Sequence, residues 1–266
     1  MIKKSPRDKI FRGDNLKKTE RWIINEWQKL PDEMKNKEVL MTLEQLYKNR
    51  GMLKIKRAAD VCISLLLIAG LSPVMAAAAI AVAAESEGGI LFRQRRITQY
   101  GRVFEILKFR TMYVSEREGS LLTAADDSRI TKVGKVLRKT KTDELPQLFN
   151  VLRGEMSLVG VRPEVERFVQ RYTPQMMTTL LLPAGMTSPA SLAFSNEEQL
   201  LSRAKDRERE YIEKILPQKM KLNIDYLENF SLKKDAGVLL KTVSATVCLA
   251  KNVLKKKNIT HHRRTS

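Results

Sequence analysis

The chain has 266 residues, enough for one domain with a buried core and appended segments. Its formal net charge of +19 favours an anionic partner: nucleic acid, an anionic membrane surface or a phosphorylated ligand. An aromatic content of 6% argues against a protein that reads single strands by stacking. The two cysteines, Cys62 and Cys248, both lie in apolar stretches, which excludes a disulfide framework and favours a reducing compartment.

Residues 1–53 are expected to form an N-terminal helical extension. Apolar residues recur at helical spacing in 16–30 and again in 38–48, and Pro31-Asp32 separates the two runs, which predicts a helical hairpin. Two interpretations stay open: a membrane-surface or partner-docking element, or a helix pair packed on the main domain. No cleavable signal peptide is expected, because the first residues are polar and basic.

The second segment, residues 54–89, contains a run of 24 uncharged residues from 61 to 84, and a bilayer span needs about 20. Ser72-Pro73 lies at its midpoint, where proline removes a backbone hydrogen bond and the Ser72 hydroxyl can satisfy the freed carbonyl. Lysine and arginine flank both ends, which favours a cytoplasmic position for both. Half-helices of about 11 residues reach only about half of the bilayer core. We therefore expect a re-entrant membrane helix broken at Ser72 and Pro73; the alternatives are a kinked span and a soluble buried helix.

Residues 90–112 change to the alternating pattern of strands. The runs 90–96 and 102–109 surround a Tyr100-Gly101 turn, which predicts a β-hairpin. Arginines on the first run can simply solvate an edge strand. The group Lys108, Arg110 and Thr111 follows the second run, and cationic and hydroxyl groups are typical ligands of diphosphates.

The stretch 138–164 concentrates the chemistry. Basic residues lead into the adjacent carboxylates Asp143 and Glu144, at the expected start of a helix. Four apolar residues then fall at helical spacing and predict one buried face: Leu145, Leu148, Phe149 and Leu152. Two interpretations follow. The acids are a helix cap and a first-turn acid, worth about 0.5–2 kcal/mol, or they serve phosphate chemistry with the nearby arginines.

The remainder is expected to be helical, with one loop. Helices are predicted over 164–182, 196–213 and 216–235, and prolines predict a loop over 181–191. Residues 90–235 would then form the main folded domain. A last apolar stretch over 236–250 is too short to span, so residues 236–266 are expected to form an amphipathic helix and a basic tail.

Several motifs stand in one order between residues 54 and 245. They are KR..D, FRQRR, KFRTM, the block DELPQL.NVL.G.MSLVG.RPE, and P.GMT. This order resembles the monotopic phosphoglycosyl transferases, the bacterial sugar transferase family. The resemblance implies an α+β, mostly helical fold: a re-entrant membrane helix, a small β-hairpin and a cytoplasmic helical catalytic domain with interfacial amphipathic helices.

The resemblance also implies an activity. Such enzymes transfer a sugar 1-phosphate from a UDP-sugar to polyprenyl (undecaprenyl) phosphate and release UMP, at the cytoplasmic face of the bacterial inner membrane. It assigns Asp143 as the nucleophile of a covalent phosphosugar intermediate, which can also be the helix cap, with Glu144 as partner carboxylate and Mg²⁺ near Asp143. Nearby cations are expected to keep the nucleophile ionised. The candidate substrate- and phosphate-binding residues are Lys108, Arg110, Arg129, Gln147 and Arg162.

The chain departs from the family pattern at three positions. Val161 and Ala184 stand where the family usually has proline, and Thr98 where it often has glycine. None removes a charged group, so activity is expected to survive. The alternative is a catalytically inactive membrane-bound scaffold of the same fold. The expected partners are the UDP-sugar, the lipid acceptor, membrane lipids and a second copy in a homodimer, with no nucleic acid.

Overall fold

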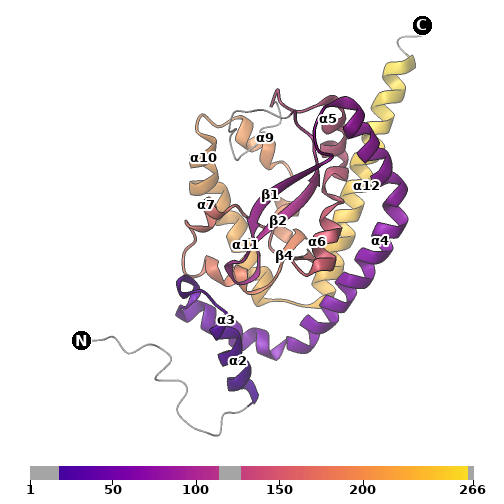
Figure 1. Cartoon of the computed structure of the whole chain (residues 1–266). Coiled ribbons are helices and arrows are strands. Elements are labelled where there is room, and N and C mark those ends of the chain that lie inside the picture. Colours follow the sequence, from indigo (N-terminus) through magenta and orange to yellow (C-terminus); the bar gives the residue numbers. More distant parts are fainter. Residues whose placement is uncertain (1–17, 114–126, 263–266) are drawn as a thin grey trace.

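The computed structural model describes residues 18–113 and 127–262. It is mostly helical, with two small two-stranded sheets at the centre of the domain (Figure 1). The expected α+β, mostly helical fold is confirmed at this level. Predictions for residues 1–17, 114–126 and 263–266 lie outside the described residues.

The N-terminal hairpin consists of α2 (Lys18–Gln28), a short 3-10 turn and α3 (Lys37–Lys48). The Asn36 side chain caps α3 by accepting a hydrogen bond from the Val39 backbone, at 2.9 Å. Val39 and Leu43 of α3 share a buried cluster with Phe168 and Leu181 of the main domain. Of the two interpretations, the structure therefore shows the helix pair packed on the domain.

Helix α4 (Arg50–Glu85) is a single continuous helix, and Pro73 lies inside it. The predicted break at Ser72-Pro73 is therefore wrong for the backbone. The Ser72 hydroxyl donates to the Ala69 carbonyl at 2.8 Å. That carbonyl is the one that proline at position 73 deprives of its donor, so the hydroxyl keeps the helix continuous, as the expected compensation requires.

One face of α4 is apolar and exposed. Among the described residues, α4 is the one helix that is long and apolar enough to cross a membrane, with a mean hydropathy of 2.4 in its most apolar window. Only 11% of that window is buried in the protein. Leu66 and Ile80, for example, are more than two-thirds exposed. By length, composition and exposure, this helix is able to enter or cross a membrane.

The predicted hairpin is confirmed. Strands β1 (Leu91–Ile97) and β2 (Val103–Phe109) pair antiparallel, with Leu91 opposite Phe109. Tyr100 and Gly101 adopt positive φ angles of 59° and 71° in the turn, which is the conformation that glycine accepts readily.

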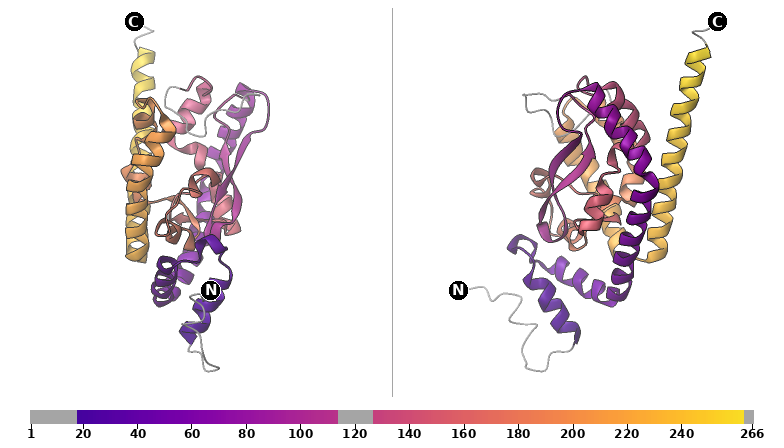
Figure 2. Two further views of the ribbon diagram at one scale, coloured as in Figure 1. Left: turned by 90° about the vertical axis from the view of Figure 1, so that its left-hand side faces the viewer. Right: turned by 45° about the vertical axis from the view of Figure 1, so that its right-hand side comes forward.

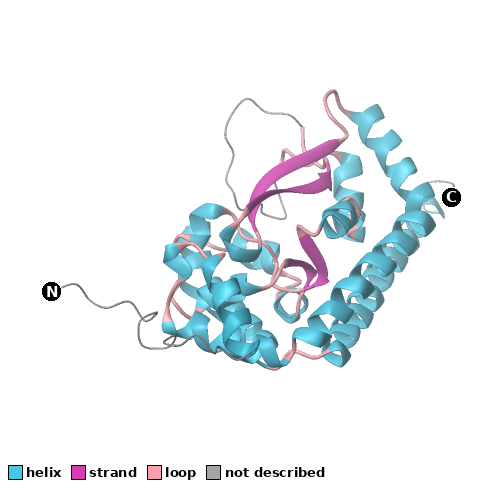
Figure 3. Ribbon diagram, turned by 60° about the horizontal axis from the view of Figure 1, so that its bottom comes forward, coloured by secondary structure: helices cyan, strands magenta, loops and turns pink. Residues whose placement is uncertain are grey.

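A second sheet was not predicted. Strand β3 (Met156–Val159) pairs in parallel with β4 (Ala184–Thr187), inside the segment expected to be a loop (Figure 3). Gly160 and Gly185 make this pairing possible, because a Cβ on Gly185 would lie 2.2 Å from the Gly160 backbone. Two short strands 25 residues apart leave little periodic signal for a sequence to carry.

The remaining helices differ in length from the predictions. The helix expected over 164–182 is only the short α7 (Glu166–Val169) and a 3-10 turn over Met176–Leu181, and 196–213 contains α9 and α10 with an irregular π turn after them. The helices around the site are α5 (Lys132–Thr140), α6 (Gln147–Arg153), α8 (Pro189–Ala193), α9 (Glu197–Ser202), α10 (Arg207–Glu210) and α11 (Leu216–Glu228). On α6, Leu148 is buried as expected, but Phe149 is 38% exposed.

The last helix, α12 (Leu232–His262), is longer than the predicted 236–250. Its start lies close to the start of α4, where Lys56 pairs with Asp235 at 2.6 Å, and its first half packs on α5, β3 and β4. It then extends beyond the domain (Figure 2). One face of α12 exposes the apolar side chains of Leu240, Val243 and Val247. Both long helices therefore expose apolar side chains.

Candidate active site

Asp143 and Glu144 lie in a short 3-10 turn, Thr142–Glu144, between α5 and α6. The turn follows Lys141, whose backbone has a φ of 56° and ends α5. Helix α6 begins only after Pro146, and neither acid caps it. The interpretation of Asp143 as a helix cap is therefore wrong. A different role is required for an acid whose residue is only 7% exposed.

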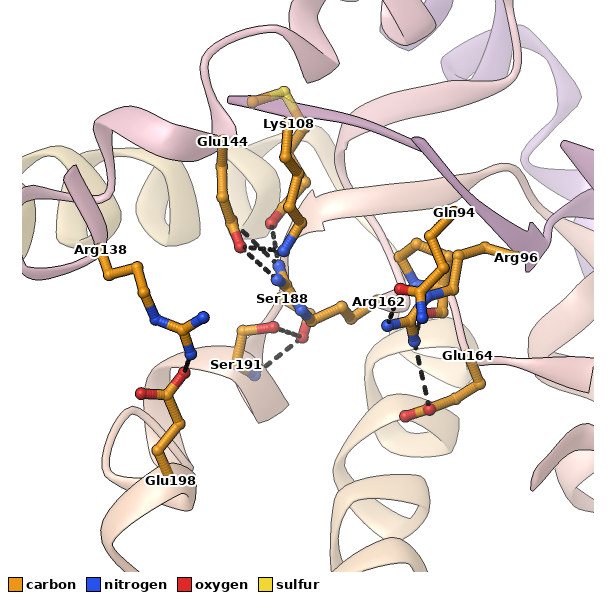
Figure 4. A network of polar contacts seen from close by, with 12 residues as sticks. Gln94, Arg96, Lys108, Arg138, Glu144, Arg162, Glu164, Ser188, Ser191 and Glu198 are labelled. Carbon is orange, nitrogen blue, oxygen red and sulfur yellow. Dashed lines mark hydrogen bonds and ion pairs between the residues drawn. The ribbon is translucent and has the colours of Figure 1, made fainter. Parts of the chain in front are cut away.

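Glu144 holds two cations from distant parts of the chain. Lys108 Nζ of β2 lies 2.9 Å from its Oε1. Arg162, which follows β3, bonds Oε2 through Nη1 at 3.2 Å and Oε1 through Nη2 (Figure 4). Arg162 also donates to the Met186 carbonyl of β4, at 3.3 Å. The structure thus brings together three of the predicted site residues, Glu144, Lys108 and Arg162, beside Asp143.

The two acids are in different electrostatic environments. Burial raises the pKa of Glu144, but the charges of Arg162 and Lys108 outweigh it and hold this pKa well below its usual range. Burial and the neighbouring charge of Glu144 instead raise the pKa of Asp143 to about 6. The charges of Lys108, Lys141 and Arg138 lower the pKa of Asp143, as expected, but they only partly offset the effects of burial and of Glu144. Asp143 remains mostly ionised at neutral pH.

Asp143 has a free coordination position. Its Oδ1 is buried and has no hydrogen-bond partner among the described residues. In that part of the chain, no group of three or more histidine, cysteine or acidic side chains could hold a metal ion by itself. Mg²⁺ commonly binds one or two carboxylates together with substrate phosphates. One open carboxylate beside a phosphate-binding lysine and arginine fits that pattern.

The other predicted site residues lie in different settings. Gln147 is fully buried on the first turn of α6, and neither atom of its amide has a partner in the described structure. Arg110 is turned away: its guanidinium donates to the carbonyls of Ser86 and Glu87 after α4. Arg129 forms an ion pair with Asp127 at 2.7 Å. A phosphate contact of Arg110 or Arg129 stays a prediction.

Sequence reasoning missed a second charged cluster, behind Arg162. Glu164 accepts a hydrogen bond from the Tyr211 hydroxyl, and Lys219 Nζ lies 3.4 Å from Glu164 Oε1 and 3.0 Å from Glu197 Oε2. Arg96 of β1 donates to the Pro163 carbonyl at 3.2 Å. Tyr211 and Lys219 belong to the segments 196–213 and 216–235, which the sequence predicts only as helices, so the three-dimensional structure is needed to reveal the burial of these two side chains.

An ion pair closes another side of the site. Arg138, at the end of α5, pairs with Glu198 of α9 (Figure 4). Its positive charge also opposes the rise in the Asp143 pKa. The two residues are 60 positions apart, so no local motif links them.

Two of the three departures from the family pattern meet in space. The Thr98 hydroxyl donates to the Glu155 carbonyl at 2.6 Å and accepts a hydrogen bond from the Ala184 backbone N–H at 3.1 Å. A proline at position 184 would have no such N–H, and a glycine at 98 no hydroxyl. The third, Val161, is buried, and its carbonyl accepts from Gly185 at 2.8 Å.

Comparison with known proteins finds one family and several relatives of that family. Residues 51–248 match the model of the family described as bacterial sugar transferase. A UDP-glucose:undecaprenyl-phosphate glucose-1-phosphate transferase of Caulobacter vibrioides is 38% identical over 192 residues, which is 71% of this chain and 68% of that protein. The exopolysaccharide production protein ExoY of Sinorhizobium fredii is 32% identical over 74% of this chain and 86% of its own length.

A longer relative matches over the same region. The UDP-N-acetylgalactosamine-undecaprenyl-phosphate N-acetylgalactosaminephosphotransferase of Aeromonas hydrophila is 36% identical over 193 residues. The matched region is 71% of this chain, but it spans only 43% of the Aeromonas protein.

Proposed function

The chain belongs to the bacterial sugar transferase family, and from that premise we propose that it transfers a sugar 1-phosphate from a UDP-sugar to undecaprenyl phosphate and releases UMP. The observation that carries the proposal is the buried Asp143, with an unpartnered carboxylate oxygen, beside Glu144, Lys108 and Arg162. The names of the relatives supply the substrate classes.

The first step is a displacement at phosphorus. An Asp143 carboxylate oxygen attacks the phosphorus that carries the sugar, and the bond from that phosphorus to UMP breaks, so that UMP leaves with the electron pair. A phosphate oxygen of the lipid acceptor then attacks the same phosphorus and breaks its bond to Asp143. This double displacement divides one difficult transfer into two easier ones and restores the carboxylate.

The residues around Asp143 supply orientation and charge. Lys108 and Arg162 are positioned to bind the phosphate oxygens. Glu144 orients both cations but leaves some of their N–H donors unoccupied. The Glu144 pKa is held low, so Glu144 stays an anion that orients these cations. Gln147 has donor and acceptor atoms free for a substrate or a water molecule.

Mg²⁺ is part of this proposal. Asp143 Oδ1 and the donor diphosphate would hold it, and the ion would neutralise phosphate charge and favour the departure of UMP. Removal of divalent ions is therefore expected to abolish transfer, whereas re-addition of Mg²⁺ restores it.

The placement in the cell is proposed from α4. We place the protein on the cytoplasmic face of the bacterial inner membrane, with both ends of α4 on that side, so that this helix enters the membrane without crossing it. The proposed division of the chain is 1–53, 54–89, 90–235 and 236–266, and a homodimer is included in the proposal. The products would serve as lipid-linked starters of a surface polysaccharide or glycoconjugate.

A release assay tests the function. UMP is measured from a panel of UDP-sugars with undecaprenyl phosphate present, for the wild type and for Asp143→Asn. One sugar is expected to give rapid release in the wild type and at least about a thousandfold less in the variant, since the nucleophile is lost. No release with any sugar would favour the inactive scaffold.

Cysteine labelling tests the topology. In a background where Cys62 and Cys248 are serine, single cysteines near positions 55 and 93 are expected to react from the cytoplasmic side. Reaction of the two positions from opposite sides would instead establish a spanning helix.

A further inference from the structure

The nucleophile lies between two short helices that are both held by α4. Helix α5 leads into the 3-10 turn that carries Asp143, and α6 begins three residues after that turn's last residue, Glu144. The far end of α5 is its start, near Lys132, and the far end of α6 is its last turn, near Leu152. Whatever fixes these two ends also fixes the position of the turn between them.

The start of α5 is capped by the last residue of α4. Glu85 Oε1 accepts from the Lys132 backbone N–H at 2.7 Å, and Oε2 accepts from the Val133 N–H at 2.8 Å. A carboxylate that binds two free amides at a helix start also complements the helix dipole. The acid comes from 47 residues away in the chain, so it joins two separate elements.

The end of α6 is capped by Arg57, near the beginning of α4. Arg57 Nη1 donates to the Val151 carbonyl at 2.6 Å, and Nη2 donates to the Leu152 carbonyl at 3.0 Å. A guanidinium that binds the last carbonyls is the matching arrangement for a helix end. Helix α4 thus binds the N-terminus of α5 through Glu85 and the C-terminus of α6 through Arg57.

The packing between the caps follows the same division. Ile63 and Leu67 of α4 share a buried cluster with Leu148 and Val151 of α6. Beyond Pro73, Ala78 and Val82 share another cluster with Leu137 of α5. The first half of α4 therefore supports α6, and the second half supports α5.

We propose that α4 is a brace for the nucleophile, with Arg57 and Glu85 as positioning residues that set the placement of the turn Thr142–Glu144 through α6 and α5. Because the outer face of α4 is apolar and exposed, this arrangement connects the membrane-facing surface to the reacting carboxylate. The catalytic consequence rests on the proposed function; the structural one does not.

Hydrogen exchange tests the structural part in the full-length protein. In both Arg57→Ala and Glu85→Ala, amide exchange is expected to rise over the turn at 142–145, although neither side chain touches it. The matched controls are Lys54→Ala and Glu87→Ala, which remove exposed charges from the same two regions. A change confined to the helix end that each residue caps would overturn the brace.

Kinetics test the catalytic part. The two alanine variants are expected to lower kcat at least about tenfold with little change in KM, because a displaced nucleophile reacts slowly even when substrate binds normally. Arg57→Lys and Glu85→Gln each retain part of the cap and are expected to recover part of kcat, and they replace the alanine variants if those fail to fold. Wild-type kcat in folded alanine variants would refute the positioning role. An inactive wild type refutes the proposed function instead, and the exchange result still decides the brace.

Discussion

The contact between Thr98 and Ala184 gives the sharpest prediction about stability. Both residues are almost completely buried, and the Thr98 hydroxyl serves two backbone groups, the Glu155 carbonyl and the Ala184 N–H. Thr98→Val keeps the shape but removes the hydroxyl. A buried polar group left without a partner costs about 1–3 kcal/mol. Since the change leaves a donor and an acceptor unsatisfied, we expect a loss of about 2–3 kcal/mol in the free energy of unfolding.

The double-mutant cycle isolates the interaction. Ala184→Pro removes the N–H that Thr98 satisfies, so in the Thr98→Val background it also removes an unsatisfied donor. The double variant is therefore expected to be at least about 1 kcal/mol more stable than the sum of the two single changes predicts. Urea unfolding in detergent, followed by circular dichroism, measures all four proteins. Additive effects, or a Thr98→Val change within about 0.5 kcal/mol of wild type, would refute the reasoning.

Three further predictions concern the site. In metal-free protein, a carbodiimide that reacts with protonated carboxyls is expected to label Asp143 with a midpoint near pH 6, because burial raises the pKa of Asp143 to about 6. Labelling is lost as the pH rises through this value. A midpoint near pH 4 would contradict this environment. Arg162→Lys is expected to lower kcat/KM by about 100-fold, because a lysine cannot make the two parallel hydrogen bonds by which an arginine binds a carboxylate or a phosphate. Nearly normal turnover would show that a positive charge alone suffices. Gln147→Leu is expected to leave the urea midpoint unchanged or raised, since both amide atoms lack partners, and to raise KM; a large loss of stability would reveal hidden partners.

Local patterns predicted much of the fold. Alternation and the Tyr100-Gly101 turn were sufficient for the hairpin, and the adjacent serine and proline were sufficient for the hydrogen bond from Ser72 to the Ala69 carbonyl. The parallel pairing of β3 with β4 was missed because its stabilising contacts join residues far apart in sequence. The continuity of α4 was not predicted, because proline usually breaks a helix and here the Ser72 hydroxyl replaces the hydrogen bond that Pro73 removes.

The residues of the site were predictable where a local motif contains them. Motif order identified Lys108, Glu144 and Arg162, which the fold brings into contact. Arg110 is also a cation in the same motif, but it follows the end of β2, and its guanidinium binds the carbonyls of Ser86 and Glu87 after α4. The roles of Tyr211 and Lys219 depend on burial against Glu164, and charged residues in a helical segment give no sign of that burial.

The central claim is that Asp143 carries the phosphosugar. Wild-type protein is mixed with the active UDP-sugar and Mg²⁺ without the lipid acceptor, quenched rapidly, digested and analysed by mass spectrometry. The account predicts a sugar phosphate on Asp143, one UMP released for each modified protein, and loss of the adduct when undecaprenyl phosphate is added. Transfer to the lipid at a normal rate with no adduct on Asp143, or equal UMP release by Asp143→Asn, would contradict it.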